Sequence, residues 1–393
     1  MLTAYDKKRR QLVSLFDQSF ANLQRLKAKK WFCPACQQPV ILKLGSLKIP
    51  HFAHCKGQSC NYEAEAETPE HLALKRLFAK WCHKESLPVE VEPYLPSVKQ
   101  RPDLLLGQLA LEIQCSPLSL RRFRQRTQAY HQAGYQVIWL CGAKLFSAKQ
   151  LTELNRQMCY YSRQLGFYLW QANWQQETLT LFFHIEETQT HQLYASQKTW
   201  SFYQNSLMEV LNYPENNQLF VQRNYSLEVL LQAYYHKILQ QFSYKNKYLG
   251  EIQYYLYQQQ YHILYLPEWF YYPGLRLFPV KHSDLYLKFK VWQSLKQLPS
   301  KTHSKAALIR RINNSIAQEV DSLRSYPNIS ICDVLRYCTQ CIFIWLLNCQ
   351  IIRPDKNNYR VVLPECSCLS LAFRKLPKNP KFLNFISTTP AKL

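Results

Sequence analysis

Two short apolar runs separated by a polar pair form the clearest strand pattern in the chain. Leu104-Leu105-Leu106 and Leu109-Ala110-Leu111 flank Gly107-Gln108, as two antiparallel strands joined by a tight turn do. The runs from Pro88 to Val91 and from Tyr135 to Cys141 predict one further strand before this hairpin and one after it. These segments therefore predict a sheet of at least four strands.

Apolar residues at helical spacing predict a helix before the first of these strands and another before the last. Thr68-Pro69-Glu70 has the composition of a helix start, with a capping hydroxyl, a proline at the first helical position and an acidic first turn. Ser119 can cap the second helix, and its sheet-facing residues should be Leu120, Phe123, Thr127 and Tyr130. The predicted order is helix, three strands, helix, strand.

The rest of the chain predicts less regular domains around this core. Residues 11 to 28 suggest a strand and an amphipathic helix, residues 178 to 184 a strand, and residues 225 to 265 helices rich in Tyr and Gln. We expect domains at residues 1–62, 66–150 (or to about 190) and 200–370, followed by a basic tail at residues 371–393. The aromatic residues past 150 could stack on unpaired bases, but ordinary core packing is the favoured interpretation.

Polar residues at the open end of the hairpin give it candidate chemistry. Folding at the turn brings Asp103, which precedes the first run, back towards Glu112, which ends the second. Alternation along the strand places Gln114 on the same face as Glu112 and Ile113 in the core. Two carboxylates and an amide oxygen form an oxygen-rich pocket of the kind that Mg²⁺ or Mn²⁺ prefers. The competing interpretation is that buried strands often end in a charged residue without any catalytic role.

Cysteine and histidine residues near the start of the chain predict a second metal site. Cys33-Pro-Ala-Cys36 has the two-residue spacer of a zinc knuckle, and the later candidate ligands are His51, His54, Cys55 and Cys60. With four protein ligands such a zinc would be structural, because no position stays open for chemistry. The alternative is a degenerate knuckle whose side chains pack without metal.

Charge and composition limit the partners. The 393 residues contain 49 Lys and Arg against 26 Asp and Glu, a net charge of +23, which favours a polyanionic partner such as nucleic acid or a membrane surface. The sequence contains no run of 18 apolar residues and no secretory signal pattern. We therefore expect a cytoplasmic protein without membrane insertion, whose 14 cysteines are mostly reduced.

The order of elements resembles the restriction-endonuclease-like nuclease core, whose motif is Pro-Asp, a spacer and Asp/Glu-x-Lys. Pro102-Asp103 and Glu112-Ile113-Gln114 match this motif, with Gln in the Lys position. The words CPAC, KIPHFAHC, EHLALK, RPD, EIQ and RQRTQAY occur in this order over roughly residues 30 to 141. With them the chain resembles the competence protein CoiA family of naturally transformable Gram-positive bacteria.

This resemblance implies a fold and a set of site residues. The fold would be α/β: a restriction-endonuclease-like αβββαβ core, a small Cys/His zinc-ribbon-like domain before it and a mostly α-helical region after it. The resemblance favours Cys33, Cys36, His54 and Cys60 as zinc ligands, with His51 as the main substitute. It also implies a further carboxylate at Glu70, which His71 and Lys75 follow.

The function that we expect is metal-dependent cleavage of DNA, with Asp103, Glu112 and the carbonyl of Ile113 holding the ion and Gln114 orienting water. Gln cannot supply the charge of the usual Lys, so a nearby Lys or Arg must cover that role or activity is weak.

The residues expected to contact DNA are Arg126, Arg122, Lys75 and Arg101, although an arginine-rich helix is more often a solvated face. A second Arg-Pro-Asp, at 353–355, lacks the following strand and predicts only a turn.

Natural transformation is the biological role that the resemblance implies, with incoming single-stranded DNA as substrate and RecA-type recombination proteins as partners. The rival interpretation is a non-catalytic DNA-binding recombination adaptor on a degenerate nuclease fold. An RNA-binding zinc-ribbon protein is a third candidate, but it would leave the Pro-Asp and Glu-x-Gln motifs without a purpose.

Overall fold

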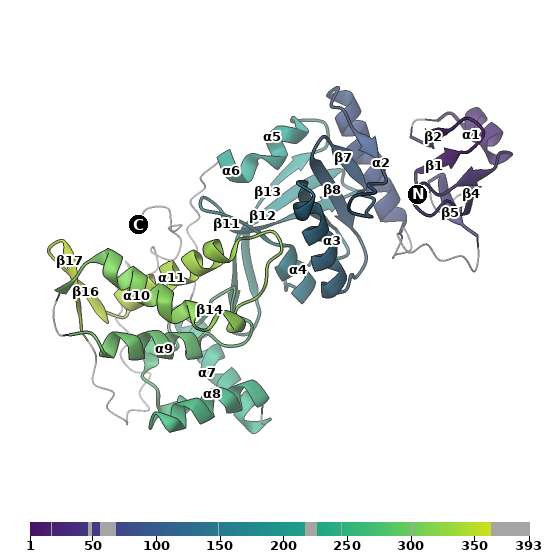
Figure 1. Ribbon diagram of the computed structural model, residues 1–393. Coiled ribbons are helices and arrows are strands. Elements are labelled where there is room, and N and C mark those ends of the chain that lie inside the picture. Colours follow the sequence, from purple (N-terminus) through teal and green to yellow (C-terminus); the bar gives the residue numbers. More distant parts are fainter. Residues whose placement is uncertain are drawn as a thin grey trace. The chain divides into compact units, whose positions relative to one another are not determined.

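The computed structural model of the chain describes residues 1–16, 18–45, 49–55, 68–147, 149–216, 226–244, 246–299 and 302–362 (Figure 1). The chain divides into two units. The first unit consists of Met1–Tyr160, Tyr168–Phe183 and Gln197–Asn216, and the second of Tyr161–Phe167, His184–Ser196 and Asn217–Leu393. Each unit is thus assembled from more than one stretch of chain.

The N-terminal part of the first unit is a small sheet with one helix. Its elements are β1 (Thr3–Asp6), β2 (Gln11–Ser14), α1 (Phe20–Lys27), β3 (Trp31–Phe32), β4 (Pro39–Lys43) and β5 (His51–His54), and the strand order is β2-β1-β3-β4-β5. On β4 the buried residues Val40 and Leu42 alternate with exposed ones, as expected for a sheet with one covered face. They share a core with Leu23, Trp31 and Phe52.

The segment from α2 to β9 has the predicted order of helix, three strands, helix and strand. Its elements are α2 (Pro69–Lys84), β6 (Glu90–Val91), β7 (Leu104–Leu106), β8 (Leu109–Gln114), α3 (Leu120–Gln132) and β9 (Gln136–Gly142). The Thr68 hydroxyl accepts from the His71 amide at the start of α2, and Ser119 caps α3 in the same way. Strands β6, β7 and β8 are antiparallel, and β8 and β9 are parallel.

Further strands extend this sheet. They follow α4 (Glu153–Met158) and are β10 (Tyr160–Ser162), β11 (Gly166–Asn173), β12 (Thr178–Thr188) and β13 (Leu193–Ser201). The strand order is β13-β12-β11-β9-β8-β7-β6, with β10 paired to β11 and β14 (Leu275–Arg276) paired to β12. Helices α5 (Leu207–Leu211) and α6 (Tyr213–Asn216) end the first unit. Of these strands, the sequence pattern predicted only part of β12.

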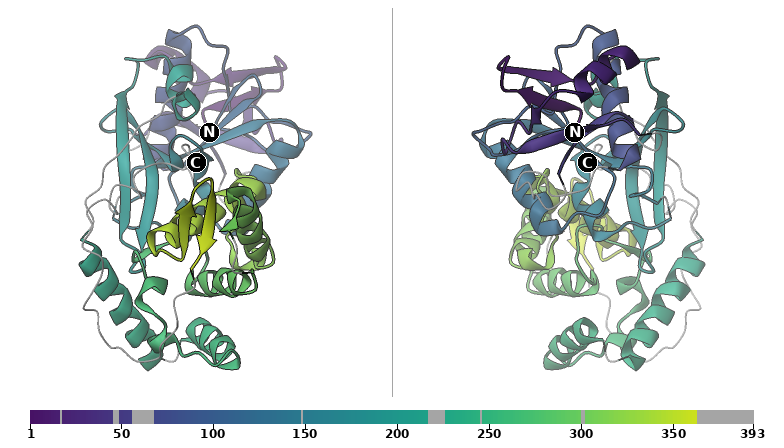
Figure 2. Two further views of the ribbon diagram at one scale, coloured as in Figure 1. Left: turned by 90° about the vertical axis from the view of Figure 1, so that its left-hand side faces the viewer. Right: turned by 90° about the vertical axis from the view of Figure 1, so that its right-hand side faces the viewer.

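The second unit is mainly helical. Its helices are α7 (Leu227–Ser243), α8 (Lys247–Gln258), α9 (Leu285–Lys296), α10 (Lys305–Ala317) and α11 (Ile331–Asn348), and its three-residue helices are Ile263–Tyr265, Glu268–Phe270 and Val320–Ser322. Strands β15 (Thr302–His303), β17 (Asn358–Val361) and β16 (Ile352–Asp355) form a small sheet in that order. The second Arg-Pro-Asp, expected to form a turn, lies instead in β16, and the turn follows it at residues 356–357 because the polar residues there join β16 to β17. Figure 2 shows α9, α10 and α11 gathered beside this sheet. The aromatic rings of Phe270, Trp292 and Trp345 fill the space between helices.

The structure confirms the predicted fold class: an α/β core with a Cys/His-rich segment before it and a helical region after it. In the described part of the chain, no helix has the length and apolar character needed to cross a membrane. The predicted basic tail at residues 371–393 lies outside the described residues.

Candidate functional site

Asp103 and Glu112 lie level with each other at the open end of the β7–β8 hairpin. Leu104 pairs with Leu111, and the two acidic residues occupy the next position of the same register. Only 8% of Asp103 and 2% of Glu112 is exposed. Two carboxylates buried this close together destabilise a fold unless cations and hydrogen-bond donors accompany them. Such partners surround both groups.

Three groups hold Asp103 in its ionised form. Its Oδ1 lies 2.9 Å from Nε2 of His71 and 3.7 Å from Nζ of Lys75, and its Oδ2 accepts a 2.8 Å hydrogen bond from the Ile113 amide. Burial on its own would raise the pKa of the Asp103 carboxyl, but His71, Lys75 and the Ile113 amide outweigh burial and lower the pKa to about 2. Asp103 is therefore a fixed anion at neutral pH.

Glu112 is held from the other side by helix α3. Its Oε1 accepts hydrogen bonds of 2.6 Å from Nη2 of Arg126 and 2.6 Å from the hydroxyl of Tyr130. Burial raises the pKa of the Glu112 carboxyl and the charge of Asp103 raises it further, while Arg126 and Tyr130 offset only part of this rise. The Arg126 guanidinium also lies over the Trp139 ring, 5.1 Å from its centroid. Arg126 and Tyr130 are four residues apart, so one face of α3 presents both.

The other predicted catalytic residues are placed differently. Glu70 is buried on α2, and its Oε1 accepts a 2.8 Å bond from the Ala143 amide just beyond β9. A Cβ at Gly142 would lie 2.9 Å from that oxygen and 2.8 Å from Sγ of Cys115, so glycine makes the close approach possible. The side-chain amide of Gln114 donates to the carbonyl of Ser116 at 2.8 Å.

None of the four residues expected to contact DNA is fully exposed. Lys75 is only 1% exposed and pairs with Glu92, so the structure does not present it on a surface that DNA could reach. Arg126 is engaged by Glu112, while Arg101 and Arg122 are half-buried. Helix α3 instead exposes Arg121 and Arg124.

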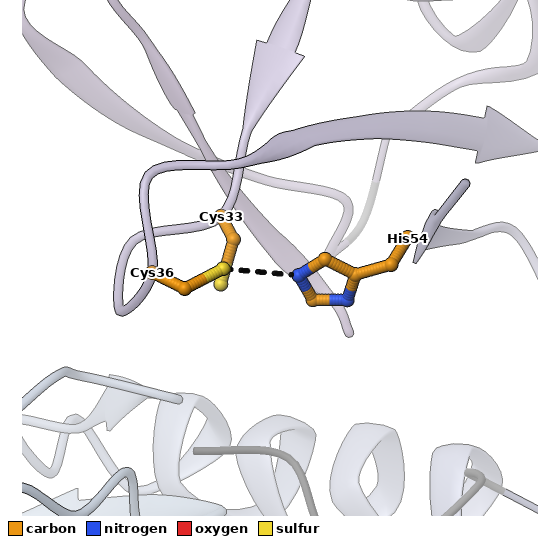
Figure 3. A group of neighbouring side chains, drawn as sticks. All are labelled: Cys33, Cys36 and His54. Carbon is orange, nitrogen blue, oxygen red and sulfur yellow. Dashed lines mark hydrogen bonds between the residues drawn. The ribbon is translucent and has the colours of Figure 1, made fainter. Parts of the chain in front are cut away.

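The Cys/His segment brings together three of its four predicted ligands. Figure 3 shows Cys33, Cys36 and His54 turned toward one another, with Cys36 Sγ 3.3 Å from His54 Nε2. The three donor atoms lie within 4.8 Å of one another. The Cys33 carbonyl accepts from the Gln37 amide at 3.0 Å, which closes the knuckle between β3 and β4. Two thiols and an imidazole are a donor set suited to Zn²⁺.

The remaining zinc candidates are also located by the structure. His51 and His54 are three residues apart on β5, so their side chains lie on opposite faces and only His54 faces the two thiols. The ring Nδ1 of His51 lies 2.9 Å from the Ile49 carbonyl. Cys60 lies outside the described residues. Across the ranges that the structure describes, no other group of three or more His, Cys, Asp or Glu donors is this close, so Asp103 and Glu112 remain a pair.

Two residues of the carboxylate site were not predicted from the sequence. Tyr130 was expected only as core, although its four-residue spacing from Arg126 indicates a shared helix face. Glu92 is buried and contacts Lys75, but it belongs to no motif and follows a strand of only two residues. Its place could not be inferred from spacing.

Two family descriptions match this chain. "Competence protein CoiA, N-terminal domain" matches residues 15–63, and "Competence protein CoiA, nuclease-like domain" matches residues 67–215. The chain belongs to the competence protein CoiA family. The first match contains the Cys/His cluster, and the second contains the Asp103–Glu112 pair.

One curated relative is the protein named "Competence protein CoiA" from Bacillus subtilis (strain 168). It is 36% identical over 123 residues, which cover 30% of this chain and 33% of the relative. The aligned part therefore spans about a third of the length of that relative. No solved structure matches the chain.

Proposed function

We propose that this chain processes DNA in competence, and that its nuclease-like domain hydrolyses phosphodiester bonds with a divalent metal ion. The observation that carries the proposal is the buried, level pair of Asp103 and Glu112 inside the region that matches the family's nuclease-like domain. The relative from Bacillus subtilis is named for competence, which supports that biological setting.

Asp103 and Glu112, together with the backbone carbonyl of Ile113, would hold Mg²⁺ or Mn²⁺. Oxygen ligands on a rigid hairpin suit these hard cations, and a cation would offset the burial and the charge of Asp103, which together raise the pKa of Glu112. When bound, such an ion supplies a Lewis acid for the scissile phosphate. The donor set therefore fits the proposed reaction.

The surrounding residues of the chain orient this pair. Arg126 and Tyr130 fix one oxygen of Glu112, and the Ile113 amide fixes one oxygen of Asp103. His71 also faces this pair, with its Nε2 2.9 Å from Oδ1 of Asp103. Because these groups are buried, their hydrogen bonds act at a lower dielectric than in water.

DNA is the polyanion that we propose as substrate. The net charge of +23 and the exposed Arg121 and Arg124 on α3 favour binding to a phosphate backbone. A single-stranded form is favoured by exposed tyrosines in the second unit, because aromatic rings stack on unpaired bases. These tyrosines are Tyr244, Tyr248, Tyr254, Tyr257 and Tyr265. Other tyrosines of the region, such as Tyr234 and Tyr271, are buried in the way that ordinary packing predicts.

For the Cys/His cluster we propose a structural zinc held by Cys33, Cys36 and His54, with Cys60 as the fourth ligand. The three described donors come from the β3–β4 knuckle and from β5, so a zinc would link the turn between two inner strands to the edge strand of a small sheet. A domain of this size has a small core and gains much of its stability from such a link.

A non-catalytic DNA-binding adaptor is the second candidate function. Gln114 favours it, because this residue supplies no positive charge and its amide is engaged by the Ser116 carbonyl. In this case the buried charges would only stabilise the domain, and DNA would bind the exposed basic surface.

The experiment is cleavage of labelled single-stranded, duplex and branched DNA with Mg²⁺ or Mn²⁺, with binding recorded on the same samples. Asp103→Asn should abolish cleavage and leave binding within about twofold, because it removes a metal ligand and no surface charge. Asp355→Asn is the matched control, since Asp355 ends the second Arg-Pro-Asp and pairs only with Arg360 at the surface in the contacts seen. Absence of cleavage by the wild-type protein on every substrate, with binding intact, would leave the adaptor as the function.

A further inference from the structure

A cation lies beside Asp103 although the nuclease-like motif does not provide one. The motif position is occupied by Gln114, whose side chain is neutral and bonds to the Ser116 carbonyl. Lys75 enters the same site from helix α2, and its Nζ lies 3.7 Å from Oδ1 of Asp103. Only 1% of Lys75 is exposed, so its charge acts inside the domain and not on bulk solvent.

Glu92 holds this lysine in place. Glu92 Oε1 forms an ion pair with the Lys75 ammonium, and both side chains are 1% exposed. The Glu92 amide donates a 3.1 Å bond to the Asp103 carbonyl, so the same residue also fixes the backbone of the metal-binding aspartate. A buried ion pair is stable only when its remaining donors and acceptors are satisfied.

The second oxygen of Glu92 reaches the first strand of the chain. Glu92 Oε2 accepts from the Leu2 amide at 2.8 Å, from the Thr3 amide at 3.1 Å and from the Thr3 hydroxyl at 3.0 Å. Glu92 has a φ of +53°, in the left-handed region that is unfavourable for a residue with a side chain. Such backbone strain is concentrated at functional sites, where the surrounding contacts maintain it.

We propose that Lys75 supplies the positive charge that Gln114 lacks, and that Glu92 is the positioning residue that ties Lys75 to strand β1. This inference rests on the proposed nuclease function and assigns a residue to it. In the reaction, water adds to phosphorus and a P–O bond of the diester breaks. One proton of the water goes to the departing oxygen, and the other is released from the phosphomonoester product. Lys75 stays buried beside Asp103 throughout, and its charge offsets the negative charge that gathers at the site without contacting DNA.

The first test moves the charge to the motif position. The pair of substitutions Lys75→Met and Glu92→Gln removes the ion pair without leaving a buried charge unpaired. It should lower kcat about 100-fold, as the loss of one group that stabilises a transition-state oxyanion does, and leave DNA binding within about twofold. Adding Gln114→Lys to this double variant should then recover at least about 10-fold, because the ammonium returns to the same site from β8.

The second test separates positioning from stability. Glu92→Gln alone leaves Lys75 without the carboxylate that holds it beside Asp103. We expect kcat to fall while KM and the folded fraction, read by circular dichroism, stay unchanged, and we expect Gln114→Lys to restore kcat in this variant. A purely structural role would instead lower the folded fraction, and Gln114→Lys would restore nothing. Cys115→Ser, at a neighbour of Lys75, is the control and should leave kcat unchanged.

The outcomes distinguish this inference from the proposed function. If wild-type protein cleaves DNA, Asp103→Asn does not, and the double variant cleaves like wild type, the role of Lys75 is overturned and the nuclease remains. If wild type cleaves nothing, both fall. If the double variant does not fold, Gln114→Lys in the wild-type background decides: no gain in kcat supports an existing cation at Lys75, and a gain of about 10-fold or more overturns it.

Discussion

Tyr130→Phe removes one oxygen atom from the site and nothing else. The Tyr130 hydroxyl donates a 2.6 Å bond to Glu112, which keeps its second bond to Arg126. The ring can stay in place, since it is fully buried and packs edge-on to Tyr135 with centroids 6.4 Å apart. A hydrogen bond to a charged group contributes about 1.5–3 kcal/mol, and we expect the low end because Arg126 remains.

The measurement is hydrogen–deuterium exchange of the full-length protein, read by mass spectrometry on peptides that contain β8 and α3. A loss of about 1.5 kcal/mol in the free energy of opening corresponds to about 10-fold faster exchange. Tyr135→Phe, the same change on the neighbouring ring, is the control and should leave exchange unchanged. Equal exchange in wild type and Tyr130→Phe would refute the energetic role of this bond.

The same variant has a predictable dependence on pH. Burial raises the pKa of Glu112 in the folded protein, so its ionisation destabilises the fold as pH rises through that value. The Tyr130 hydroxyl favours the ionised form, so its removal should matter more as pH rises and Glu112 loses its proton. Exchange rates of wild type and variant should converge as pH falls and Glu112 takes up a proton.

Three further predictions concern other parts of the first unit. The purified protein should contain about one zinc per chain by elemental analysis, and Cys33→Ser should lose it while Cys332→Ser, at an exposed cysteine, should retain it. Asp103, whose pKa is lowered from 3.8 to about 2, should contribute about 2 kcal/mol of stability above pH 4 that is lost as pH falls through 2. Urea unfolding of wild type and Asp103→Asn over this range checks it, and parallel curves would contradict it. Gly142→Ala should destabilise by about 1–3 kcal/mol, because its Cβ would press on Glu70 and Cys115, whereas Gly250→Ala, with open space and a helical backbone, should stabilise slightly.

Local patterns in the sequence were sufficient to predict the hairpin and the Cys/His knuckle. The turn at Gly107 and the alternation around Glu112 determine which side chains lie opposite each other on the two strands. Both are properties of residues that are neighbours in the sequence. The same holds for Cys33 and Cys36, which are three residues apart. Fold class followed from the order of such local elements.

Contacts between segments that are distant in the sequence could not be predicted from such local patterns. The bonds from Glu92 to Leu2 and Thr3 join residues about 90 positions apart, and no periodicity encodes them. Strands β11 and β13 escaped prediction because β11 is buried almost throughout and β13 is mostly half-exposed, so neither alternates cleanly. The partnership of Lys75 with Glu92 reversed the expected role of that lysine, because burial is a property of the whole fold.

The way in which β11 and β12 cross between the two units limits how the protein can be dissected. The unit boundary falls within β11, between Phe167 and Tyr168, and within β12, between Phe183 and His184. A truncation after residue 216 would therefore strip the second unit of most of its chain and leave residues 161–167 and 184–196 attached to the first. During synthesis the first unit has all of its own segments once residue 216 has emerged, while those two short segments must wait for the rest of their unit. A fragment that ends at residue 216 therefore contains the whole first unit, whereas every continuous fragment that contains the whole second unit also carries segments of the first.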